Sequence, residues 1–218
     1  IVNAKRQALH RLNRLRSADP APISGLDSLL INQVQFYDDP VRFTAKINEL
    51  CDELETRVAK KEGVASTGTP RILVSGCPMA APNWKLPAII EKSGAVIVGE
   101  ESCVGERGTR NLVDLQGAST REEILDRIAQ RYLGIDCAVF TPNPERIEHV
   151  SEMAGAYKAN GVVHYELQFC TPYTMEGFAV RQAMNKNGIP SLRIETDYSM
   201  EDAAQIQTRV QAFLEILK

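Results

Sequence analysis

The chain has 218 residues, of which 44% are hydrophobic and 24% charged, as in a globular protein with one or two domains and a substantial core. A net charge of −3 argues against nonspecific nucleic-acid binding, and no apolar run reaches the roughly 18 residues of a membrane span. Five scattered cysteines indicate reduced thiols in a cytoplasmic protein, not a secreted disulfide framework. Because the first residue is Ile and no signal peptide precedes it, we expect a C-terminal fragment of a longer chain.

The N-terminal part is expected to be a helical section over residues 1–62. Apolar residues at helical spacing predict three helices, over 1–16, over 26–37 and from Pro40 onwards. Cys51 lies beside the apolar stripe of the third helix and is therefore expected to be a core thiol. The Gly- and Thr-rich residues 63–70 are expected to be a linker.

Residues 71–218 alternate between strand and helix signals, which indicates an α/β domain. The predicted strands cover 71–76, 95–99, 162–169 and about 190–195. The predicted helices cover about 83–93, a stretch from a Ser119–Glu122 capping box to about 133, 145–159, 174–187, and a last helix capped by Ser199. Right-handed crossovers then give an open, doubly wound four-stranded parallel sheet of flavodoxin or Rossmann type. For the strand order, our hypothesis is 2-1-3-4.

Three cysteines follow the ends of three predicted strands. Cys77 follows the first strand, Cys103 the second and Cys170 the third, and each has Gly or Pro nearby. Parallel strands bring their carboxyl ends to one edge, so these thiols are expected to converge there. Single cysteines on separate loops, without paired zinc knuckles, favour an iron–sulfur cluster over a zinc site.

Other residues near these loops are candidates with open alternatives. Cys137 is a fourth possible ligand, although its apolar neighbours favour burial almost equally. Arg107 and Arg110 could balance cluster charge or hold a phosphate or carboxylate, or they could form surface ion pairs. Glu101 could contact substrate or perform acid–base work if it is desolvated. No residue is assigned a catalytic role.

The chain resembles the 2-hydroxyacyl-CoA dehydratase family, which includes benzoyl-CoA reductase subunits. The resemblance covers about residues 71–175 and rests on four segments: SGCPMAAPNWKLPAIIEKSGAVIV, GEESCVGERGTRNLV, QRYLGIDCAVFTPNPERI and VVHYELQFCTPY. The second segment replaces the usual D-D-x-C-T-G pattern, and Cys77 is an additional thiol. Both departures are similar to the double-cubane cluster protein branch.

This resemblance implies an iron–sulfur reductase or dehydratase component with a 4Fe–4S or double-cubane cluster. It implies that Cys77, Cys103, Cys137 and Cys170 are metal ligands, with further ligands on an N-terminal domain absent from this chain. The implied partners are an ATP-dependent iron–sulfur activator that supplies low-potential electrons, and a second subunit in a homodimer or heterodimer. The alternative is a non-enzymatic binding or assembly domain whose cysteines belong to the core.

Overall fold

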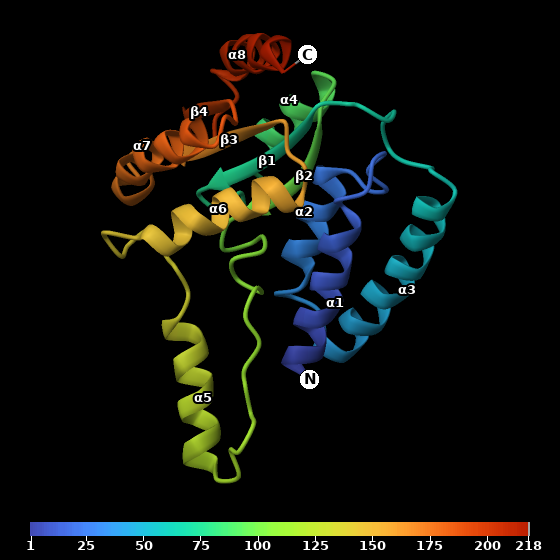
Figure 1. Ribbon diagram of the computed structural model, residues 1–218, viewed down its shortest axis with the longest axis vertical. Helices are drawn as coiled ribbons and strands as arrows, with labels where there is room; N and C mark the ends of the chain where they lie inside the picture. The colour runs from blue at the N-terminus through green and yellow to red at the C-terminus, as the bar shows by residue number, and fades with distance from the viewer. Residues whose placement is uncertain (218) are drawn as a thin grey trace.

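The computed structural model describes residues 1–217 and is built around a four-stranded parallel sheet (Figure 1). The strands are β1 (Arg71–Gly76), β2 (Val96–Glu101), β3 (Gly161–Leu167) and β4 (Ser191–Thr196). Their order is β2-β1-β3-β4, and every neighbouring pair is parallel. The predicted α/β class and strand order are confirmed. Crossover helices explain why the strands are parallel, because each helix returns the chain to the same edge of the sheet before the next strand begins.

Helices cover both faces of the sheet, which is why β1 and β2 are buried along their whole length. One face packs against α2 (Gly25–Val34), α4 (Lys85–Lys92) and α8 (Ala203–Ile216). The other face packs against α6 (Pro144–Ala156) and α7 (Thr171–Lys186).

The first and third helices form a second, smaller core. It lies between α1 (Val2–Leu15) and α3 (Pro40–Ala59) and includes the fully buried Cys51, as expected. Between them in sequence, α2 packs on the sheet through Leu29 instead. The division into a section over 1–62, a linker over 63–70 and a domain over 71–218 stays a prediction. No helix within residues 1–217 combines the length and apolarity needed to cross a bilayer.

The helix α5 (Arg121–Leu133) projects away from the sheet at the end of two long connections (Figure 1). Its capping box uses Thr120 and Glu123, one residue later than predicted. The sequence contains both Ser119-x-x-Glu122 and Thr120-x-x-Glu123, so the motif alone leaves a one-residue ambiguity.

Two other boundaries differ from the prediction. The last helix begins after Asp202, not after Ser199, because residues 197–202 form turns in which the Ser199 N–H donates to Asp197 Oδ1 at 2.8 Å. Strand β2 continues through Glu100 and Glu101, which pair with Val74 and Ser75 of β1. Charged residues can end a buried strand here because buried arginines accompany both carboxylates.

Candidate functional site

Three cysteines lie just beyond the carboxyl ends of parallel strands, as predicted. Cys77 follows β1 directly, Cys103 lies two residues after β2, and Cys170 precedes the first residue of α7, three residues after β3. The turn before Cys77 requires glycine. Gly76 has φ +118°, and a Cβ atom there would lie 2.0 Å from the carbonyl oxygen of Tyr165.

The Cys77 and Cys170 thiols are neighbours. Cys77 is buried, and its Sγ accepts the backbone N–H of Leu167 at 3.4 Å. Burial raises the pKa of Cys77 to about 12, although the Leu167 N–H opposes this shift, and the nearby Cys170 thiol raises the pKa further. Without a metal, the Cys77 thiol is therefore neutral at physiological pH.

The other two candidate cysteines occupy different surroundings. Cys103 is exposed, and Arg107 Nη1 lies 3.7 Å from its Sγ. Cys137 is half-buried in the loop before α6, where the Asn143 amide donates to its carbonyl oxygen at 2.9 Å. The soft donors and nearby N–H groups suit an iron–sulfur cluster. However, within residues 1–217 no three side chains of metal-ligating type are gathered closely enough to hold an ion.

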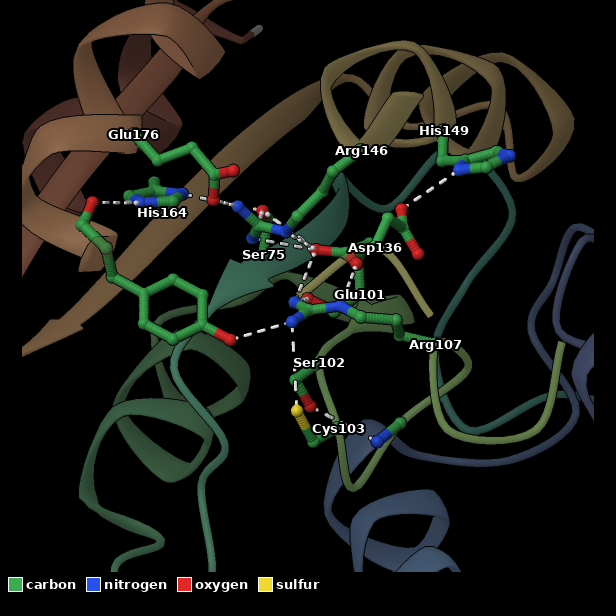
Figure 2. Close-up of polar contacts among 12 residues, drawn as sticks. Ser75, Glu101, Ser102, Cys103, Arg107, Asp136, Arg146, His149, His164 and Glu176 are labelled. Atoms are coloured by element: carbon green, nitrogen blue, oxygen red, sulfur yellow. Dashed lines mark hydrogen bonds and ion pairs between the residues drawn. The ribbon is translucent and has the colours of Figure 1, made fainter. Parts of the chain in front are cut away.

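A buried ionic network lies behind these loops and is centred on Glu101 (Figure 2). Arg107 donates to Glu101 through Nε at 2.7 Å and Nη2 at 3.1 Å. Arg146, from α6, donates to Glu101 Oε2 through Nη2 at 2.9 Å. All three side chains are fully buried. The Glu101 carboxylate and the Arg107 guanidinium are therefore ion-paired with each other.

The network extends from the sheet to α7. Arg146 pairs with Glu176, and Arg107 Nη1 donates to the Tyr173 hydroxyl at 2.7 Å. The guanidinium carbons of Arg146 and Arg107 lie 5.0 Å and 5.7 Å from the centre of the Tyr173 ring, within cation–π range. Burial, reinforced by Arg146, lowers the pKa of His164 to about 3. His164 is therefore a neutral hydrogen-bonding residue at physiological pH.

Arg110 belongs to a separate ion pair. Arg110 contacts Asp136. The Oδ2 atom of Asp136 also lies 3.0 Å from His149 Nδ1 (Figure 2). Burial opposes ionisation of Asp136, but the His149 hydrogen bond and the Arg110 charge together hold its pKa below the usual range. The structure thus brings Glu101 and Arg107 together and places Arg110 in a neighbouring pair.

A further carboxyl group with a buried oxygen belongs to the half-buried Glu106, in the loop after β2. Glu106 lines a cavity of about 240 Å³ together with Asn13 and Tyr157. Its Oε1 is buried and has no hydrogen-bond partner within residues 1–217. Burial raises the pKa of Glu106 to about 7, against the opposing effects of the nearby Tyr157 hydroxyl and the Arg16 charge.

Sequence reasoning missed Arg146, Tyr173 and Glu176. Each occurs within an ordinary amphipathic helix, so nothing in its local pattern separates it from a surface residue. The only available signal was the pair of glutamates that ends β2. Two carboxylates in a buried strand require cationic partners from somewhere in the fold.

Comparison with known proteins places the chain in a family. Residues 1–217 match the family model described as 2-hydroxyglutaryl-CoA dehydratase, D-component. The chain is 37% identical over 222 residues to the dehydratase subunit YjiM of Escherichia coli (strain K12). It is 27% identical over 219 residues to the (R)-phenyllactyl-CoA dehydratase beta subunit of Clostridium sporogenes. It is 24% identical over 225 residues to the beta subunit of (R)-2-hydroxyglutaryl-CoA dehydratase of Acidaminococcus fermentans.

Each of these matches covers the whole chain but only 55% or 56% of the relative. The chain thus spans about half the length of the curated relatives it matches. The family match runs through the cysteine-bearing loops and the helical N-terminal section alike. The chain therefore belongs to the 2-hydroxyglutaryl-CoA dehydratase D-component family.

Proposed function

We propose that this chain is the cluster-binding part of a 2-hydroxyacyl-CoA dehydratase-like enzyme component that depends on an iron–sulfur cluster. The observation that carries the proposal is the position of Cys77, Cys103 and Cys170, one at the carboxyl end of each of three parallel strands. Membership of a dehydratase family supports an enzymatic role over a purely structural one. A cluster would supply one-electron reduction of the substrate.

The ligands proposed for the cluster are the four thiols of Cys77, Cys103, Cys137 and Cys170. Leu167 and Arg107 already offer N–H groups to Cys77 and Cys103, and such donors stabilise thiolate sulfur. Cys77 must lose its proton on binding, and a nearby iron ion lowers the pKa of a coordinating thiol. The Glu101 network anchors the Arg107 side chain, so this cation is held beside Cys103.

The relatives are named for (R)-phenyllactyl-CoA and (R)-2-hydroxyglutaryl-CoA. We therefore propose a CoA thioester of a 2-hydroxy acid as the substrate class. The alternative substrate is a small molecule that is reduced at a double-cubane cluster. The proposed partners are a second subunit, which the name "beta subunit" of two relatives supports, and an ATP-driven iron–sulfur activator. We propose the cytoplasm as the location of the complex.

The test is the iron and acid-labile sulfide content of the intact protein, purified without oxygen, together with its absorption near 400 nm. We expect a cluster in the native protein and a large loss of iron in Cys170→Ala, because Cys170 is held between β3 and α7. The matched control is Cys51→Ala, since Cys51 is buried between α1 and α3 away from the sheet edge. An iron-free native protein, or equal iron loss in both variants, would contradict the proposal and favour an assembly domain.

A further inference from the structure

A cavity of about 250 Å³ is lined by residues of α1, by Cys103 and by the end of α5. We call it the α1–α5 cavity and define it by Lys5, Arg6, Cys103, Arg131 and Tyr132. Two of its cations come from the first helix, and the third comes from the helix that projects from the body. Residues more than 100 positions apart in the sequence therefore build one concave site.

The charge of this cavity is unbalanced. Lys5, Arg6 and Arg131 line it, and no carboxylate within residues 1–217 forms an ion pair with any of them. Arg6 is only 3% exposed and Arg131 only 6%. Buried charges are normally paired, because removing an ion from water without a counterion is costly. Three unpaired cations around one cavity thus indicate an anionic occupant.

The guanidinium groups are held in place by neutral partners. Arg6 donates to Asn3 Oδ1 at 3.2 Å and to the Tyr132 hydroxyl at 3.3 Å. Arg131 donates through Nε to the Asn111 carbonyl at 2.9 Å, and its guanidinium carbon lies 4.7 Å from the centre of the Tyr132 ring. Neutral acceptors fix these side chains without cancelling their charge.

One donor of a residue that lines the cavity is unused. Arg131 Nη1 is buried and has no hydrogen-bond partner within residues 1–217. An orphaned charged donor of this kind is rare in a native protein unless a ligand or water satisfies it. In agreement with the geometry, burial and the neighbouring Arg6 charge lower the pKa of both Lys5 and Arg131.

We propose that the α1–α5 cavity binds an oxyanion, the phosphate or carboxylate group of a small-molecule ligand. Guanidinium groups match the paired oxygens of both anions, and the Lys5 ammonium adds a point charge. The volume exceeds that of one such group and is smaller than the roughly 300–1,000 Å³ of a site for a whole drug-sized ligand. The cavity therefore holds the charged end of a ligand whose remainder extends past the exposed Cys103. This inference does not depend on the proposed cluster.

The experiment is isothermal titration of the intact protein with inorganic phosphate and, separately, with glutarate. Lys5→Met is the main variant, because Lys5 is only half-buried and makes a single hydrogen bond, to the Gln35 carbonyl at 3.1 Å. The matched control is Lys46→Met, which removes the same charge from an exposed site on α3. We expect Lys5→Met to weaken binding about fivefold or more, as the loss of a charge contact worth about 1 kcal/mol does, and Lys46→Met to leave binding unchanged.

A second variant, Arg131→Lys, keeps the charge but removes the fork of donors, and we expect it to weaken binding as well. Preference for phosphate over glutarate would assign a phosphate ligand, and the reverse preference a carboxylate ligand. Absence of binding by both anions would overturn the proposal. Equal weakening by Lys5→Met and Lys46→Met would overturn it too, because the effect would then come from net charge and not from the cavity.

Discussion

Glu101 ends a buried strand with a full charge, and the fold tolerates this because Arg107 and Arg146 lie on either side of it. The Glu101–Arg107–Arg146 network stabilises the fold only when all three side chains are present. Breaking a buried ionic network by removing one member leaves the other charges without compensation. The same carboxylate also anchors Arg107 next to Cys103. A defect at Glu101 should therefore affect both stability and the cysteine loop.

The corresponding prediction concerns Glu101→Gln. We expect a loss of about 3 kcal/mol in the free energy of unfolding, because two buried guanidinium groups lose their common counterion. Urea denaturation measures this change. The control is Glu122→Gln, an exposed change in the first turn of α5, which should cost less than about 1 kcal/mol. A stability of Glu101→Gln equal to that of the control would show that the network is not structural.

Glu106 should make stability depend on pH. Its pKa of about 7 in the folded protein lies above the ordinary value of 4.5. As pH rises from about 4.5 to 7, the unfolded chain releases this proton before the folded protein does, so the free energy of unfolding falls across this window. At about 1.4 kcal/mol per pKa unit, and with allowance for partial exposure, the effect is about 2 kcal/mol.

Urea titrations of the native protein and of Glu106→Gln between pH 4.5 and pH 8 test this prediction. We expect the variant to lose the downward slope and to be relatively most stable above pH 7. An identical slope in both proteins would mean that another group titrates. The sequence could not reveal this behaviour, because Glu106 lies in a polar loop and its burial against α1 and Tyr157 arises only from the tertiary fold.

At the scale of elements, the turn after β1 sets the position of Cys77. Gly76→Ala would force a Cβ atom against the Tyr165 carbonyl and strain a backbone with φ +118°. We expect a loss of at least about 2 kcal/mol, measured by urea denaturation. Gly155→Ala in α6 is the matched control, because nothing lies within 4 Å of its added Cβ. This control should be stabilised by about 0.5–1 kcal/mol, as a helical glycine replaced by alanine usually is.

The existence of the helices and strands could be predicted from the sequence more accurately than their boundaries. Apolar runs and right-handed crossovers were enough for the parallel sheet, whereas they only restricted the strand order, which was a hypothesis that the structure confirms. The start of α5 was misplaced by one residue because Ser119 and Thr120 both satisfy the capping motif. The end of β2 was placed too early because its two glutamates are unfavourable in a strand until buried arginines accompany them. Local patterns therefore identify elements, while long-range charge pairing sets some of their ends.

At the scale of the whole molecule, the N-terminal helices and the sheet share buried polar contacts. Arg71, the first residue of β1, donates to the carbonyl oxygens of Arg16 at 2.9 Å and Ala18 at 2.8 Å. The same guanidinium donates to the Tyr157 carbonyl beyond α6 at 2.9 Å. Leu29 of α2 also lies in the core of the sheet. These contacts couple the section over residues 1–62 to the α/β part.

We therefore expect the helices α1–α3 and the sheet to unfold together. Hydrogen exchange followed by mass spectrometry at increasing urea concentration should show α1, α3 and β1 losing protection at the same concentration. Arg71→Met removes the shared donor and leaves three carbonyl acceptors without it, so α1 and α3 should then open at lower urea than β1. Arg42→Met, an exposed change on α3, should leave the transitions coincident. Earlier opening of α1 and α3 in the native protein would instead support two independent units, with the boundary near residues 63–70.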